Sequence, residues 1–275
     1  MQAISDVEQL SQLCKELRRD ILDMVYIAGS GHIGGSFSAT ELMSVLFFNV
    51  MHHDPQNPQD ENRDRFILSK GHCTPIYYSI LAHCDYFPHE ELQSFRKIDS
   101  RLQGHPDKSK FPLMESTSGS LGQGLSIAAG MAFALRLKNI PAKIYCLMGD
   151  GELDEGQVWE SFATINKYKL SNLIIIIDHN NIQLGGSNED IKNLEPLKEK
   201  FTSFGFTVLE VDGHTIPALL EIFTAAKKES DEGKCMILIA HTIKGKGVSF
   251  MENTAFWHGI APNKEEYEKA MQELE

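Results

Sequence analysis

Two short apolar runs stand out in the hydrophobic pattern near the middle of the chain. One spans residues 142–148, and the other spans residues 173–177 and is almost pure isoleucine. Continuous apolar runs of this length are typical of strands in parallel sheets that are covered on both faces. Between them, residues 155–168 place apolar side chains such as Val158 and Phe162 at helical spacing. The pattern therefore predicts a strand–helix–strand unit.

The same alternation continues in both directions. Helical patterns cover residues 6–28, 39–51, 74–84, 119–137 and 216–228, and short strand patterns cover residues 67–70, 207–211 and 236–241. The first helix is bounded by Ser5 or Asp6 as its cap and by Gly29, and the helix at 119–137 is expected to be buried and closely packed. Strands separated by helices imply parallel connections. We predict an α/β fold, a doubly wound, mostly parallel sheet with helices on both faces, in a single domain spanning residues 1–275.

Composition narrows the possible partners and the setting. The 275 residues carry a net charge of −12 and no basic stripe, which argues against nucleic acid as a partner. The apolar runs are far shorter than the roughly 20 residues that a membrane span needs. Five scattered cysteines without CxxC spacing indicate a reduced, cytoplasmic setting.

Polar residues follow both central strands where these end. Gly149-Asp150-Gly151-Glu152 follows the first strand, and Asn180-Asn181-Ile182 follows the second. Ligands of such folds bind beyond the carboxyl ends of the strands. A carboxylate, a carboxamide and a carbonyl from Asn181 or Ile182 would suit Mg²⁺, which prefers oxygen ligands. Either motif alone is as consistent with an ordinary turn, but the pair predicts a metal–diphosphate site.

The glycines of the first motif add to this prediction. Gly149 and Gly151 would let the chain turn sharply and leave backbone N–H groups open to a phosphate. A second glycine-rich segment, residues 119–124, has the order GxxGxG rather than GxGxxG and follows no convincing strand. A nicotinamide dinucleotide site is therefore disfavoured.

Four histidines stand beside glycines, namely His32, His72, His105 and His258. Glycine neighbours favour a loop on which the ring is reachable. No pair has the spacing of a zinc site. Each histidine alone could simply cap a turn.

The motifs together resemble a known family. GDGELDEGQVWE followed by DHNNI resembles the thiamine diphosphate motif, and the flanking sequence is similar to transketolase. The resemblance runs through nearly the whole chain and keeps the family order, with the motifs SGHIGGSFSATE, RDRFILSKGH, QGHPD, STSGSLGQGLSIAAGMA, HTIKGKGV and FWHG. A full-length transketolase would continue beyond FWHG into a pyrimidine-binding domain. The chain therefore resembles the N-terminal subunit of a split transketolase.

This resemblance implies thiamine diphosphate and Mg²⁺ as cofactors and assigns roles to residues. The implied metal ligands are Asp150, Asn180 and Ile182. The implied cofactor-binding residues are His72, Gly119, Ser120, Leu121, Gly151, Glu152, Asn180, Lys244 and His258. The implied catalytic residues are His32, His105, His258 and Glu155. From the residues alone, Lys244 could belong to a solvated turn and Glu155 could be only an acid at a helix N-terminus.

The resemblance also implies an activity and a partner. The expected reaction is transfer of a two-carbon ketol unit between sugar phosphates, active only with a C-terminal, pyrimidine-binding subunit in an α2β2 heterotetramer. Deoxyxylulose phosphate synthase and the α subunit of 2-oxo acid dehydrogenases are alternatives, which LDEGQVWE and FWHG disfavour. A non-catalytic, transketolase-like binding subunit is another. The sequence does not name the sugar.

Two departures from the family pattern lie near the first histidine. Ile33 stands where the family usually has proline, and Gly34 and Gly35 replace bulkier or hydroxylated residues. A serine contact to the cofactor that some members make is therefore in doubt.

Overall fold

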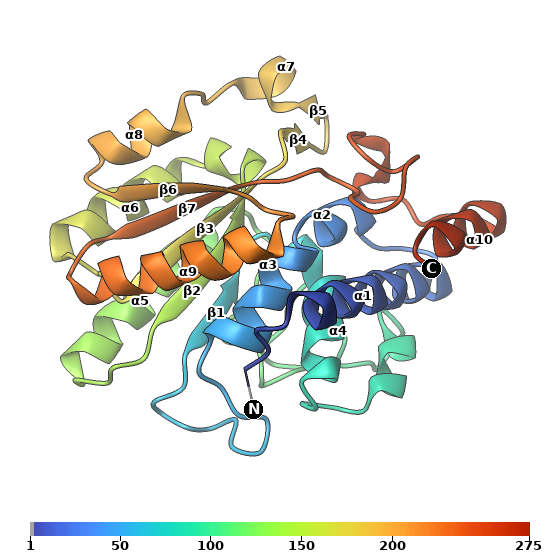
Figure 1. Ribbon diagram of the computed structural model, residues 1–275, viewed down its shortest axis with the longest axis horizontal. Coiled ribbons are helices and arrows are strands. Elements are labelled where there is room, and N and C mark those ends of the chain that lie inside the picture. The colour runs from blue at the N-terminus through green and yellow to red at the C-terminus, as the bar shows by residue number, and fades with distance from the viewer. Residues whose placement is uncertain (1–2) are drawn as a thin grey trace.

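The computed structural model describes residues 3–275, and a parallel five-stranded sheet runs through its centre (Figure 1). The strands are β1 (Arg65–Leu68), β2 (Ile144–Gly149), β3 (Leu173–His179), β6 (Thr207–Asp212) and β7 (Met236–His241). Their order in space is β1-β2-β3-β7-β6, and every neighbouring pair is parallel. All five carboxyl ends therefore lie at one edge of the sheet, and the predicted α/β fold is confirmed.

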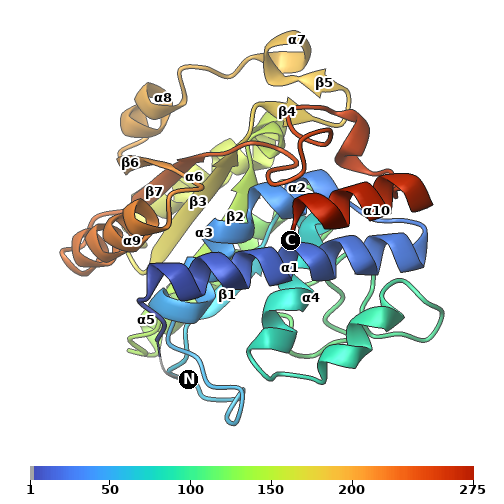
Figure 2. The same ribbon diagram turned by 45° about the vertical axis from the view of Figure 1, so that its right-hand side comes forward.

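Helices cover both faces of this sheet (Figure 1). The first face carries α1 (Val7–Ala28), α2 (Ile33–Ser38), α3 (Thr40–Val45), α4 (Thr74–His83) and α9 (Ile216–Asp231). The second face carries α5 (Gln123–Leu137), α6 (Gly156–Tyr168) and α8 (Leu197–Ser203). Beside these lie a small hairpin, β4 (Ile182–Gln183) and β5 (Gly186–Ser187), the short helix α7 (Asn188–Lys192), and α10 (Lys264–Glu273), which packs against α1 (Figure 2).

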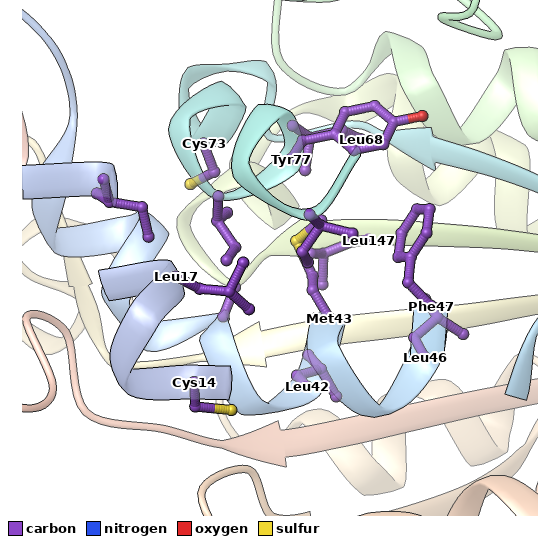
Figure 3. Packing of buried hydrophobic residues seen from close by; sticks show 14 of the residues in the cluster. Cys14, Leu17, Leu42, Met43, Leu46, Phe47, Leu68, Cys73, Tyr77 and Leu147 are labelled. Atoms are coloured by element: carbon purple, nitrogen blue, oxygen red, sulfur yellow. The ribbon is translucent and has the colours of Figure 1, made fainter. Parts of the chain in front are cut away.

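The core has two parts because successive strand residues point to opposite faces. In β2, Tyr145 and Leu147 belong to the first-face cluster, whereas Cys146 and Met148 belong to the second. Figure 3 shows the first cluster where Leu147 and other strand residues meet side chains of α1, α3 and α4. All residues of β3 are buried, as the isoleucine run predicts for a central strand covered on both faces.

Some element boundaries differ from the prediction. The helix expected at 39–51 consists of α3 and a π-helical turn at Leu46–Val50, and it is preceded by the short helix α2, which was not predicted. The helix expected from 119 begins at Gln123, because Gly119 and Gly122 have φ values of +144° and +81°, outside the helical region. It is also less buried than expected, since Leu137 is 68% exposed. The caps of α1 are as predicted, with Asp6 accepting from Gln9 and Gly29 left-handed.

No helix within residues 3–275 has the length and apolar character needed to cross a membrane.

Candidate functional site

The two strand-end motifs meet at the carboxyl edge of the sheet. Gly149 pairs with Asp178 in the β2–β3 register, so Asp150 and Asn180 follow directly on neighbouring strands. The Asp150 carboxylate accepts the backbone N–H of Asn181 at 2.5 Å and that of Gly151 at 2.8 Å. The two loops are thus tied to each other through Asp150.

Asp150 is a buried carboxylate without a cationic partner. It is 5% exposed and makes no ion pair with any residue of the described part of the chain. Burial, followed by the charge of Asp178, raises the pKa of Asp150 above its ordinary value. A buried carboxylate held only by backbone N–H groups is favourable where a cation completes its surroundings. The site therefore has the character of a cation-binding position.

Asp178, another buried acid nearby, already has a cationic partner. Lys70, two residues beyond the end of β1, forms an ion pair with Asp178 of β3 in which both side chains are almost completely buried. Burial raises the pKa of Asp178, but the charge and hydrogen bond of Lys70 outweigh this and keep the pKa below its ordinary value. Asp178 also accepts from the Asn180 side chain at 3.1 Å. The Lys70–Asp178 pair therefore holds Asn180 in position.

A cavity of about 170 Å³ opens beside Asp150. Nine of the residues to which the family resemblance gives a role line it, namely His72, Leu121, Asp150, Gly151, Glu152, Asn180, Ile182, Lys244 and His258. They come from loops far apart in the chain, which the parallel sheet brings to one edge. His32, His105, Gly119, Ser120 and Glu155 lie outside its lining.

Lys244 is a residue of the cavity and not of a solvated turn. It is 2% exposed, and its Nζ donates to the Ile182 carbonyl at 2.7 Å and to Nδ1 of His258 at 2.8 Å. Burial lowers the pKa of Lys244 to about 8. The absence of a side chain at Gly34 makes room for it, because a Cβ there would lie 3.1 Å from Lys244 Cγ. The departure from the family pattern at Gly34 thus has a steric explanation.

The other three histidines surround His32. Its ring centroid lies 5.4 Å from that of His72, 5.7 Å from that of His105 and 5.6 Å from that of His258. Burial, followed by the charge of Arg96, lowers the pKa of His32 to about 4, and burial, followed by the charge of Lys244, lowers the pKa of His258 to about 3. At neutral pH these rings are uncharged, so they serve as hydrogen-bonding groups rather than as cations.

Glu152 has both carboxylate oxygens directed at protein donors. One accepts from the Ser69 hydroxyl and from the Gly122 N–H at 2.8 Å, and the other accepts from the Gly149 N–H at 3.2 Å. It thereby joins the loops after β1 and β2 to the start of α5. The geometry gives Glu152 a positioning role at the cavity wall.

The glycines of the first motif differ from their expected role. Neither Gly149 nor Gly151 has a positive φ, so neither is required for a left-handed turn. Gly151 is instead needed for space, because a Cβ there would lie 2.9 Å from Cβ of Gln183. The left-handed residue of the site is Asn181, with φ of +62°.

The remaining predicted residues lie around the edge of the site. A Cβ on Gly119 would lie 3.4 Å from the His105 ring, so this glycine permits close approach of the histidine. Ser120 and Glu155 are exposed. Glu155 directly precedes α6 without a side-chain capping bond. The structure does not bring these two residues into the cavity.

Sequence reasoning missed three charged residues of the site. Lys70 and Asp178 lie at the ends of predicted strands. Nothing in the sequence marks them as partners, because their pairing depends on which strands are neighbours in the sheet. Arg96 lies far from any strand end, yet its guanidinium donates to Ser30 at 3.0 Å and lies 3.4 Å from Nδ1 of His32. It adds a positive charge beside the histidines.

Comparisons with known proteins agree with this geometry. A family model described as the transketolase thiamine diphosphate binding domain matches residues 10–274. An apulose-4-phosphate transketolase subunit of Phocaeicola vulgatus is 38% identical over 268 residues, which cover 98% of this chain and 94% of that protein. The 6-deoxy-6-sulfo-D-fructose transketolase subunit of a Clostridium species is 39% identical over 259 residues, which cover 94% of each chain.

Full-length transketolases match over part of their length. Human transketolase is 37% identical over 98% of this chain but only 42% of its own length. The crystal structure of Campylobacter jejuni transketolase superposes with a TM-score of 0.91 at 34% identity, covering 98% of this chain and 43% of that one. The chain therefore belongs to the transketolase family, to its thiamine diphosphate-binding domain. It matches the two separate transketolase subunits over nearly their whole length, and the predicted assignment as a transketolase subunit is confirmed.

Proposed function

We propose that the cavity beside Asp150 holds the diphosphate end of thiamine diphosphate together with Mg²⁺. The observation that carries the proposal is the buried Asp150 carboxylate, which has no cationic partner among the described residues and lines the same cavity as Asn180, with its side-chain carboxamide, and Ile182, with its backbone carbonyl. These three oxygen groups match the preference of Mg²⁺, which also takes phosphate oxygens and water as ligands. Asp150, Asn180 and Ile182 would therefore hold the metal.

The cationic and neutral groups of the cavity suit the rest of the ligand. Lys244 makes no ion pair with the described residues, so its charge is available to a diphosphate. In the present arrangement its Nζ bonds the Ile182 carbonyl, and we expect it to turn from that oxygen to the phosphate when Mg²⁺ binds. Bound thiamine diphosphate supplies the electron sink for breaking the bond next to a ketose carbonyl.

The histidines of the site suit the hydroxyl groups of a sugar substrate. Uncharged imidazoles both donate and accept hydrogen bonds, so His32, His105 and His258 suit hydroxyl groups without adding charge. Arg96 beside His32 suits an anionic group of the substrate. We propose ketose and aldose sugar phosphates as the substrate class. The relatives named for apulose 4-phosphate and for 6-deoxy-6-sulfofructose indicate that phosphate and sulfonate substrates both deserve testing.

We further propose a C-terminal, pyrimidine-binding partner in an α2β2 heterotetramer. The 170 Å³ cavity accommodates only part of a thiamine diphosphate molecule, so a second wall is needed. A groove of about 450 Å³ between α5 and α6, lined by residues such as Ala129, Gly130, Phe133 and Tyr168, offers a partly apolar surface for that partner. Trp159 of α6 does not line this groove and packs against Phe162 and Phe204.

Two further parts of the proposal concern organisation and location. We propose that the chain acts as one domain, because both core clusters pack on the same sheet. We propose a cytoplasmic location, supported by five cysteines that are all free and buried.

The test is reconstitution with a C-terminal, pyrimidine-binding transketolase subunit. The expected result is ketol transfer, dependent on thiamine diphosphate and Mg²⁺, from the mixed subunits and none from this chain alone. Full activity of the chain alone would refute the need for a partner. A mixed complex that forms but binds no thiamine diphosphate would refute the proposed site.

A further inference from the structure

Three side chains away from the cavity converge on one point between helices. Asp20 belongs to α1, His83 ends α4, and His89 begins the 3₁₀ helix His89–Ser94. These three elements pack against one another, with α1 and α4 side by side in Figure 2. None of the three residues lines the cofactor cavity.

Both imidazoles direct the same ring nitrogen at the same carboxylate. Nε2 of His83 lies 2.9 Å from Oδ2 of Asp20, and Nε2 of His89 lies 3.0 Å from both carboxylate oxygens. One ligand atom from each residue lies within 4.8 Å of the others. Zinc–nitrogen bonds of about 2.0–2.1 Å place the ligand atoms of a tetrahedral site about 3.3 Å apart. The nitrogen–oxygen distances are therefore within a few tenths of an ångström of those in such a site, and the two nitrogens lie within 4.8 Å of each other.

Burial and supporting contacts favour a defined site. The Asp20 and His83 side chains are 13% and 19% exposed, whereas His89 is 54% exposed and borders the solvent. The Ser79 hydroxyl donates to Oδ2 of Asp20 at 2.6 Å and orients the carboxylate, as outer hydrogen bonds do around metal ligands. Two ligands are thus fixed by the fold, and the open side leaves room for water as a fourth ligand.

An ion pair between Asp20 and one histidine explains the position of only one of the two rings. His83 lies in the last turn of α4, which places its ring beside Asp20. A single protonated histidine would satisfy Asp20. The second ring, with its centroid 5.2 Å from the first, would add a like charge if it were also protonated. A shared divalent cation gives both nitrogens and the carboxylate one favourable partner.

We propose that Asp20, His83 and His89 bind a divalent transition metal of the zinc class, independently of the Mg²⁺ site. Two nitrogen ligands and one oxygen ligand suit Zn²⁺ and disfavour Mg²⁺. The metal connects the 3₁₀ helix to α1 and α4. Because Arg96 follows this helix by two residues, the metal also stabilises the segment that carries Arg96 to His32.

The experiment compares metal binding by the full chain and matched variants. Metal-free protein is titrated with Zn²⁺ by calorimetry and with Co²⁺ by visible absorption, because tetrahedral Co²⁺ absorbs strongly. We expect His89→Gln to bind one equivalent less than the wild type. Saturating Zn²⁺ should raise the Tm of the wild type by about 5 °C and leave that of the variant unchanged.

The control is His241→Gln, because His241 is 49% exposed, pairs with a carboxylate and lies beside another histidine. It should bind Zn²⁺ as the wild type does. Asp20→Asn, checked for folding by circular dichroism, provides a second loss-of-ligand variant. Equal Zn²⁺ uptake by the wild type, His89→Gln and Asp20→Asn would overturn the proposal and leave an ion-pair network, as would the absence of Zn²⁺ uptake by the wild type.

Discussion

Lys70 and Asp178 form a buried ion pair across the carboxyl ends of β1 and β3, with side chains that are 1% and 0% exposed. Lys70 also donates to the Gly35 carbonyl at 3.2 Å, and Asp178 also accepts from Ser38 at 2.6 Å. The pair thus connects α2 to the sheet while Asp178 holds Asn180. Replacing a whole buried pair with apolar residues is often neutral, whereas removing one partner is strongly unfavourable.

The first prediction follows from that asymmetry. Lys70→Met should lower the free energy of unfolding by about 3–5 kcal/mol, because Asp178 is left as an uncompensated buried charge. The double variant Lys70→Met with Asp178→Leu should recover much of this loss in denaturant unfolding. Its affinity for thiamine diphosphate should nevertheless remain low, because the Asn180 side chain has lost the Asp178 carboxylate that accepts its hydrogen bond. Full cofactor affinity of the double variant would contradict the role given to Asp178.

The pair also predicts a dependence on acid. The folded-state pKa of Asp178 lies below its ordinary value, so its stabilising contribution is present above the unfolded pKa and is lost as the pH falls through the folded one. Unfolding measured between about pH 5 and pH 2 should show a loss of stability in the wild type. The loss should be smaller in the double variant, which lacks both charges.

The second prediction is that replacing Asp150 raises the stability of the metal-free chain but abolishes cofactor binding. Its folded-state pKa is raised, so the ionised carboxylate destabilises the metal-free protein once the pH is above that pKa. Asp150→Asn should therefore stabilise the metal-free chain by roughly 1 kcal/mol. The same change should abolish Mg²⁺-dependent cofactor binding in the assembled enzyme. Asp154→Asn, four residues further on, is the control and should retain binding.

The third prediction concerns Lys244 and alkaline pH. Its folded-state pKa of about 8 means that the charge is present below that pH and is lost above it. Diphosphate binding raises this pKa, so cofactor affinity should fall on the alkaline side of pH 8, by up to about tenfold per pH unit. Lys244→Arg keeps its charge and should remove this step, whereas Lys246→Arg should retain it. An unchanged pH profile in Lys244→Arg would exclude Lys244 as the titrating group.

The fourth prediction separates turnover from cofactor binding. His105 lies against Gly119 and His32 but outside the cavity lining. His105→Ala in the assembled enzyme should lower kcat by about 100-fold with the donor ketose, because it removes a hydrogen-bonding group for the reacting sugar. The Kd of thiamine diphosphate should change by less than about threefold. Comparable losses in both would indicate a structural histidine.

Much of the fold follows from the sequence because its strands are short, apolar and separated by helical patterns. The same pattern identified Asp150 and Asn180, since both follow strand ends. It did not identify Lys70 and Asp178 as partners, because the pattern does not reveal that β1 and β3 flank β2. The position of Arg96 and the convergence of Asp20, His83 and His89 depend on how helices pack, which no local spacing encodes.

The strand order has a consequence for how the protein folds. Arg65 pairs with Ile144, and Ile174 pairs with Met236, so the sheet joins segments that are synthesised far apart in time. Contacts of such long range slow folding. A nascent chain that has emerged only as far as β3 exposes the edge where β7 will pair, and it lacks Lys244 and His258. Ligand-binding competence therefore arises late in synthesis, and until then the open isoleucine strand is the part of the molecule most in need of protection from aggregation.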